Sequence, residues 1–134
     1  MGIDDIPLLG MIRGKLGYLN QRQQVVAQNI ANADTPGFTP SDLKPFTFAG
    51  HLKAQKGGLE TTDPRHIKST TSAGGATFAP EKRPDSETTL DGNQVVLEEQ
   101  MMKMTEARMD YEAAIGFYQK SMEMLRTAAR APGR

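Results

Sequence analysis

The stretch that decides the fold covers residues 29–38 and reads NIANADTPGF. Pro36 has no backbone N–H to donate and disfavours the helical conformation in the residue before it, while Gly37 can turn the chain at positive φ without steric cost. A helix that reaches this stretch should therefore end near Ala33 or Asp34, and the chain behind it takes a new direction.

The segment before this stop has the pattern of an amphipathic helix. Apolar residues recur at alternating steps of three and four, with one polar interruption, which is a heptad seam. The seam consists of Leu9, Ile12, Leu16, Leu19, Gln23, Val26, Ile30 and Ala33. Asp4 and Asp5 are candidate N-terminal caps, and Pro7 is tolerated in a first turn. We predict a helix from about Ile6 to Ala33.

A longer helical pattern occupies the C-terminal segment. Its seam also steps by four and three, and Arg108 is its only interruption. The seam consists of Leu97, Met101, Met104, Arg108, Tyr111, Ile115, Tyr118, Met122, Leu125 and Ala129. Residues of high helix propensity dominate, and Glu98 and Glu99 suit the positive end of the helix dipole. We predict a helix from about Val95 to Ala129.

The segment from Thr35 to Gln94 is rich in Gly, Pro, Ser and Thr and shows no sustained periodicity. Its prolines limit any sheet to small edges, and residues 46–48 and 76–78 are the candidate strands. A loop of this length is unusual inside a compact domain, so we expect extended loops that order against something else. The predicted organisation is an N-terminal helix (1–36), an extended, flexible middle segment (37–92) and a C-terminal helix (93–134).

These elements predict a mainly α fold, in which the two helices pair as an antiparallel, coiled-coil-like hairpin with both termini at one end. The middle segment, with room for a short β-hairpin, extends from the hairpin. Two helices leave much apolar surface uncovered, and Met102, Met109, Phe117 and Met124 lie off the C-terminal seam. We expect other copies or relatives of the chain to cover this surface, in a helical filament or tube.

Composition argues against several classes of function. Sixteen basic and sixteen acidic residues balance, which removes the net field expected of a nucleic-acid-binding protein. No apolar stretch reaches the roughly 18 residues of a membrane span, and the acidic N-terminus lacks the features of a Sec-type signal. The chain has no Cys, and His51 and His66 have no companion at metal-ligand spacing, so neither a metal nor a cofactor is predicted. Without a phosphate-binding loop or a nucleophile beside a base, the chain is not expected to be an enzyme.

Two blocks of the sequence resemble the axial proteins of the bacterial flagellum, a family of rod, hook and related subunits. The first is Arg22-Gln23 followed by residues 29–38, and its Ala33-Asp34-Thr35 version is similar to that of proximal-rod members. The second comprises Leu90-Asp91-Gly92-Asn93, Val95, Leu97-Glu98, Met101, Lys103-Met104, Tyr111, Ala113-Ala114 and Leu125-Arg126. His66-Ile67 also fits the family, whereas Phe38 stands where it often has Tyr and Arg108 lies near a frequent Asn.

The resemblance implies a structural subunit of the proximal rod of the flagellar basal body, which assembles through its terminal helices into the helical tube that transmits torque across the periplasm. It also implies export through the flagellar type III apparatus without a cleaved signal peptide. The implied partners are copies of the chain, other rod proteins, and the membrane-ring and export-gate end of the basal body. One alternative stays open: a non-polymerising helical-hairpin adaptor, or a secreted helical protein, that binds a partner helix.

Both seams and the helix stop are the candidate assembly interface. On the N-terminal side the candidates are Leu9, Ile12, Leu16, Leu19, Val26, Asn29, Ile30, Asn32, Pro36, Gly37 and Phe38. On the C-terminal side they are Leu97, Met101, Met104, Tyr111, Ile115, Tyr118, Met122 and Leu125. Gln23 and Arg108 either set the register of the helices or face solvent.

Overall fold

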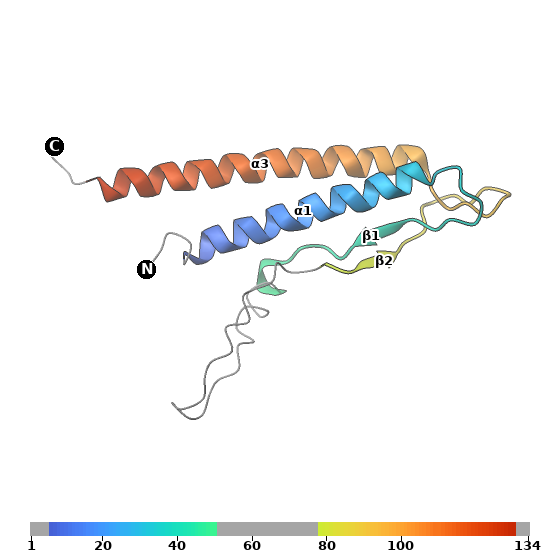
Figure 1. Cartoon of the computed structure of the whole chain (residues 1–134), viewed down its shortest axis with the longest axis horizontal. Coiled ribbons are helices and arrows are strands. Elements are labelled where there is room, and N and C mark those ends of the chain that lie inside the picture. Colours follow the sequence, from blue (N-terminus) through green and yellow to red (C-terminus); the bar gives the residue numbers. More distant parts are fainter. Residues whose placement is uncertain (1–5, 51–77, 131–134) are drawn as a thin grey trace, which may run out of the picture.

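A computed structural model describes residues 6–50 and 78–130 of the chain (Figure 1). Two long helices, α1 (Pro7–Ala31) and α3 (Leu97–Ala129), lie side by side and antiparallel. Two short strands, β1 (Ser41–Leu43) and β2 (Pro80–Lys82), lie on the other side of α1 from α3. Because α1 begins where α3 ends, the predicted mainly α hairpin is confirmed.

The ends of the helices lie close to their predicted positions. Pro7 occupies the first turn of α1, and no side chain caps this end within the described residues; the candidate caps Asp4 and Asp5 lie outside them. Helix α1 ends at Ala31, two residues earlier than predicted, and the amides of Asn32 and Ala33 then bond to carbonyls three residues back. Tightening of this kind satisfies some of the carbonyls that a helix end leaves unpaired.

The strands do not lie where the sequence suggested. Strands β1 and β2 pair antiparallel, with Ser41 opposite Lys82 and Leu43 opposite Pro80, whereas residues 46–48 are not a strand. Residues 76 and 77 lie outside the described part of the chain. Proline at the first position of a short edge strand is tolerated because no ladder hydrogen bond needs its missing N–H. The apolar pattern of residues 46–48 reflects aromatic packing instead, since the Phe46 ring lies 5.6 Å from that of Tyr18.

The described ends of the middle segment pack against α1, whereas we expected extended loops. We call residues 39–48 and 78–85 the arm. In the core cluster, Tyr18, Leu19 and Val25 of α1 pack with Leu43 of β1. Partly buried side chains extend this cluster on both sides of α1, with Phe46 and Phe78 from the arm and Tyr111 and Ala114 from α3. Helix α1 therefore has two packed sides, whereas the heptad pattern indicated one.

The predicted seam is correct along much of α1 but shifted in the first half of α3. Met101, which we placed in the seam, is 57% exposed, Leu97 is 42% exposed, and Arg108 faces solvent. Gln100 and Ala107 are fully buried in their place. Among the described residues, neither long helix contains a stretch apolar enough to cross a membrane.

Candidate assembly site

The helix stop meets a second turn at the far end of the hairpin. We call residues 32–38 and 86–93 the tip. The amide of Gly37 donates to the carbonyl of Asp91 at 3.0 Å, and the amide of Gln94 donates to the carbonyl of Phe38 at 2.9 Å. Gly37 and Gly92 have φ of 70° and 82°, which favours glycine at both positions. The two sequence blocks that carry the family resemblance therefore join at the tip.

Asn93 holds the tip together through its side chain. Its Nδ2 donates to the carbonyls of Asn32 at 3.0 Å and Thr35 at 2.7 Å, just beyond the end of α1. Its Oδ1 accepts from the amide of Val95 at 2.8 Å, at the approach to α3. Asn93 is 1% exposed, so these hydrogen bonds replace water for groups that folding has desolvated. One buried amide thus ties the end of the first helix to the beginning of the second.

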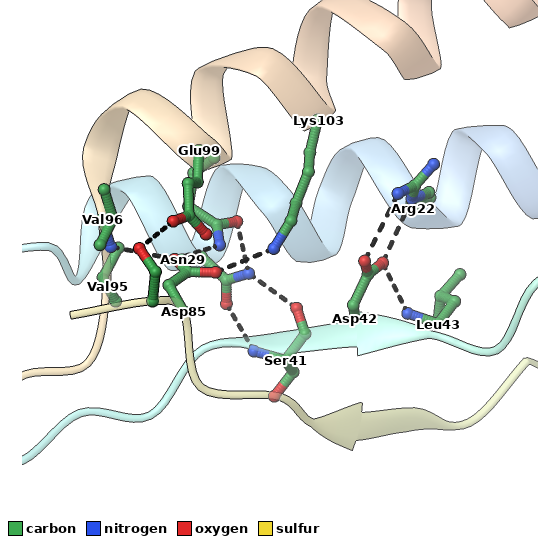
Figure 2. A network of polar contacts seen from close by, with 12 residues as sticks. Arg22, Asn29, Ser41, Asp42, Leu43, Asp85, Val95, Val96, Glu99 and Lys103 are labelled. Carbon is green, nitrogen blue, oxygen red and sulfur yellow. Dashed lines mark hydrogen bonds and ion pairs between the residues drawn. The ribbon is translucent and has the colours of Figure 1, made fainter. Parts of the chain in front are cut away.

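A second buried amide, Asn29, lies where α1, the arm and α3 meet (Figure 2). Its Nδ2 donates to the carbonyl of Ser41 at 2.7 Å and to Oε1 of Gln100 at 2.9 Å, while its Oδ1 accepts from the Ser41 amide at 3.0 Å. These hydrogen bonds belong to the fold of one chain, and the role of Asn29 in assembly stays a prediction. Among the described residues, every buried side-chain nitrogen and oxygen has a partner.

Asp85 extends this network to the beginning of α3. Its carboxylate, 1% exposed, accepts hydrogen bonds from Gln100 Nε2 at 2.7 Å, Lys103 Nζ at 2.9 Å and the Val96 amide at 2.9 Å (Figure 2). Burial raises the pKa of Asp85, but these donors outweigh it and hold the pKa below its ordinary value. The positive end of the α3 dipole also stabilises a carboxylate in this position.

An ion pair fixes the arm to the middle of α1. The Arg22 guanidinium donates from Nε to Asp42 Oδ1 at 3.2 Å and from Nη2 to Oδ2 at 3.4 Å (Figure 2). Burial lowers the pKa of Arg22, but the hydrogen bond and charge of Asp42 raise it further, so the net shift is upward. In the sequence, Arg22 stands out only as part of a family motif and Asp42 does not stand out at all, because nothing in the sequence indicates which residue of the arm faces α1.

The predicted interface residues fall into three groups. Buried within the chain are Leu9, Ile12, Leu19, Val26 and Asn29. Half-buried are Leu16, Ile30, Asn32, Phe38, Met104, Tyr111, Ile115, Tyr118, Met122 and Leu125, and Gln23 is half-buried with them. Exposed are Pro36, Gly37, Leu97 and Met101. Most of the predicted set is therefore buried or half-buried within one chain, and, apart from Leu97 and Met101, the free apolar surface of α3 lies elsewhere.

That free surface is the side of α3 that faces away from α1. Met102, Met109, Phe117 and Met124 recur at steps of seven or eight residues and are 73%, 65%, 53% and 54% exposed. We call these four residues the outer stripe. In the first half of α3, a shallow depression of about 500 Å³ is lined by Met101, Met102, Thr105, Glu106, Met109 and Asp110. Uncovered apolar side chains at this spacing suit the binding of another helical surface.

In residues 6–50 and 78–130, no three His, Cys, Asp or Glu come together in a group that could hold a metal ion. His51 and His66 lie outside these ranges. The polar clusters at Asn29, Asp85 and Asn93 join elements of the fold.

Comparisons with known proteins agree with the sequence resemblance. A family model described as flagella basal body rod protein matches residues 19–39, which cover the second half of α1, the helix stop and the beginning of the arm. The chain is 34% identical over 108 residues to the flagellar basal body rod protein FlgB of Agrobacterium fabrum, covering 80% of this chain and 81% of the relative. The FlgB of Aeromonas hydrophila is 29% identical over 132 residues, covering 97% and 98%. That of Salmonella typhimurium is 32% identical over 104 residues, covering 71% and 72%.

Proposed function

Because this chain belongs to the FlgB family of flagellar basal body rod proteins, we propose that it is a subunit of the proximal rod that assembles into a helical tube through the outer face of its long helices. In that place it would transmit torque across the periplasm. Its partners would be copies of itself, other rod proteins, and the membrane-ring and export-gate end of the basal body. It would reach the rod through the flagellar type III export apparatus without a cleaved signal peptide.

The observation that carries this proposal is the outer stripe of α3. Its four large apolar side chains face away from α1, and more than half of each is exposed. Burying an apolar side chain of this size is worth about 1.5 to 3 kcal/mol, so a neighbouring helix that covered the stripe would gain substantially. Methionine is flexible and polarisable, which suits a surface that meets neighbours of different shape.

The polar clusters stabilise the subunit itself and do not form part of the outer stripe. Asn29, Asp85 and Asn93 satisfy their hydrogen bonds inside the chain, and together they hold α1, the arm and α3 in one arrangement. A hairpin whose backbone is already ordered loses little backbone entropy when its outer stripe binds a neighbour. The tip and the hydrogen bonds of these three residues therefore stabilise the fold of one subunit, and the outer stripe forms the contact between subunits.

The test is to replace Met102 and Met109 together with Glu. Both side chains are exposed, so the variant should fold with a stability within about 0.5 kcal/mol of the unmodified chain. Two buried carboxylates in the assembled state would oppose assembly. We expect the unmodified chain to form higher oligomers as its concentration rises, in light scattering or sedimentation, and the double variant to stay monomeric and fail to restore swimming in cells that lack the protein.

Gln119→Glu is the matched control, because Gln119 is exposed on α3 and outside the outer stripe. It should oligomerise and restore swimming like the unmodified chain. A chain that stays monomeric at every concentration, together with normal swimming by the double variant, would contradict the proposal and favour the adaptor alternative.

A further inference from the structure

The net charge of this chain is zero, but its charges are segregated along the long axis. At the tip, Asp34, Glu87 and Asp91 are exposed, and residues 32–38 and 86–93 contain no Lys or Arg. At the opposite end, the last turns of α3 carry Lys120, Arg126 and Arg130, which are all exposed, against one acidic residue. That residue, Glu123, pairs with Lys120 at 3.4 Å. Asp4 and Asp5 lie outside the described residues. One end of the described hairpin is therefore acidic and the other basic.

The acidic tip also presents an apolar side chain. Leu90 is fully exposed, although the turn that carries it is held by several hydrogen bonds. The Thr89 amide donates to the Asn93 carbonyl at 2.8 Å, and the Gly92 amide donates to the Thr89 carbonyl at 2.9 Å. The Thr89 hydroxyl also donates a hydrogen bond to the Asp91 carboxylate. Because the backbone of this turn is already ordered, docking would restrict little more than the leucine side chain itself, which makes Leu90 a suitable anchor.

Two apolar sites on the outer face of α3 could receive such an anchor, and charge distinguishes them. The depression beside Met102 and Met109 is flanked by Glu106, which pairs with Arg22 at 3.7 Å, and by Asp110, whose exposed carboxylate would repel an acidic tip. The second site, between Phe117 and Met124, has Lys120 on the same face, because residues three and four apart are neighbours on a helix. Glu123 pairs with Lys120, and Arg126 and Arg130 leave this end of α3 with a net positive charge. Opposite charges around an apolar contact favour this second site and select its partner.

We propose that the tip of one subunit docks through Leu90 onto α3 of a second copy of this chain, between Phe117 and Met124, so that subunits stack head to tail. This inference rests on the proposed function, because it describes how copies of a rod subunit meet. The two surfaces of the contact differ, so each bound copy leaves a free tip and a free receiving site. A heterologous contact of this kind continues as an open helical filament.

The axial offset between copies follows from helix geometry. Within one chain Lys120 lies about 35 Å along α3 from Leu97, at about 1.5 Å per residue. Stacked copies should therefore be displaced by a distance on the order of 35 Å and should overlap along part of their length. The depression at Met102 and Met109 stays free in this arrangement for a lateral neighbour.

The absence of Cys from the natural sequence allows a direct test. A disulfide requires Cα atoms within about 7 Å, whereas position 124 lies about 40 Å from Leu97 in the same chain. A disulfide between Leu90→Cys and Met124→Cys must therefore join two copies. After oxidation of the purified full chain, and of basal bodies from cells that carry the double variant, we expect a ladder of linked multimers on non-reducing gels. Leu90→Cys with Met109→Cys is the matched control and should give at least about tenfold less product.

Charge reversal provides the second measurement. Glu87→Lys with Asp34→Lys makes the tip basic at two exposed positions and should lower the yield of the 90–124 ladder about tenfold or more. Lys120→Glu in the same chain should restore part of that yield, and 1 M salt should weaken the original ladder because screening shortens the range of the attraction. Thermal unfolding monitored by circular dichroism shows whether each variant is folded.

The outcomes separate this inference from the proposed function. If the chain oligomerises and supports rod assembly but position 90 links to position 109 as well as to 124, or to another rod protein, head-to-tail stacking of copies is wrong and the proposed function stands. If the chain neither oligomerises nor links, both fail. If the yield of linked multimers does not change with the charge of the tip or with salt, the inference is also wrong, whichever positions are linked.

Discussion

Replacing Asn29 with Ala tests whether the buried amide network holds the three parts of the subunit together. The substitution leaves the Ser41 amide, the Ser41 carbonyl and Oε1 of Gln100 without their partner at a site where Asn29 is only 2% exposed. At about 1 kcal/mol for each of these hydrogen bonds, the free energy of unfolding should fall by about 3 kcal/mol. Domains are stable by about 5 to 15 kcal/mol in total, so this loss is easily measured.

The assay is urea unfolding followed by circular dichroism at 222 nm, with Gln24→Ala as the matched control. Gln24 is exposed on the same helix, and its replacement should change the stability by less than about 0.5 kcal/mol. Asn29 and Gln100 contact each other, so the double variant Asn29→Ala/Gln100→Ala should lose at least about 1 kcal/mol less than the sum of the single losses. If Asn29→Ala costs no more than the control, or if the two losses simply add, the network does not hold the subunit as described.

Two further perturbations test the ends of the network. Because folding lowers the pKa of Asp85, its contribution to stability is present above its unfolded pKa of about 3.9 and is lost as the pH falls through the folded value. Asp85→Asn should therefore cost about 2 kcal/mol at pH 7 and flatten the fall in urea midpoint below about pH 4; parallel profiles for the two proteins would refute this. Gly92→Ala should cost about 1 to 2 kcal/mol, because φ is 82° at this position. Gly116→Ala, in the interior of α3, should instead stabilise the chain by up to about 1 kcal/mol, and equal thermal shifts for both substitutions would contradict the backbone explanation.

Local sequence signals were enough to predict the two helices. The heptad steps on each side of the middle segment, the stop at Pro36 and Gly37, and the charged first turn of α3 all depend on residues close to one another in the chain. Helix ends were therefore predicted to within about two residues, which is the usual uncertainty of such boundaries. The antiparallel hairpin followed from the same signals, because both seams need a partner and the long connection allows either helix to reach the other.

The arm could not be predicted in the same way, because its position depends on pairings that are distant in sequence. Arg22 meets Asp42, Gln21 bonds to the backbone of Phe78, and Lys82 donates to the carbonyl of Thr39. Each contact is ordinary once the chain is folded, but any one of several residues could have made it. Periodicity does not identify such partners in a segment rich in Pro, Gly, Ser and Thr.

The shift of the seam in α3 has a different cause, which connects the fold with the assembly surface. Apolarity alone predicts that Met101 is buried and Gln100 is exposed. The structure shows the opposite, because the Gln100 side chain forms hydrogen bonds with Asn29 and Asp85. A buried amide with all its hydrogen bonds made costs little, and it specifies one register of the helices where a methionine would allow several. The reversal leaves Met101 facing solvent beside Met102, at the edge of the depression on the outer face. The polar network that fixes the monomer thus also frees apolar side chains for a neighbour, so substitutions at Gln100 should affect both stability and assembly, whereas substitutions at Met102 should affect assembly alone.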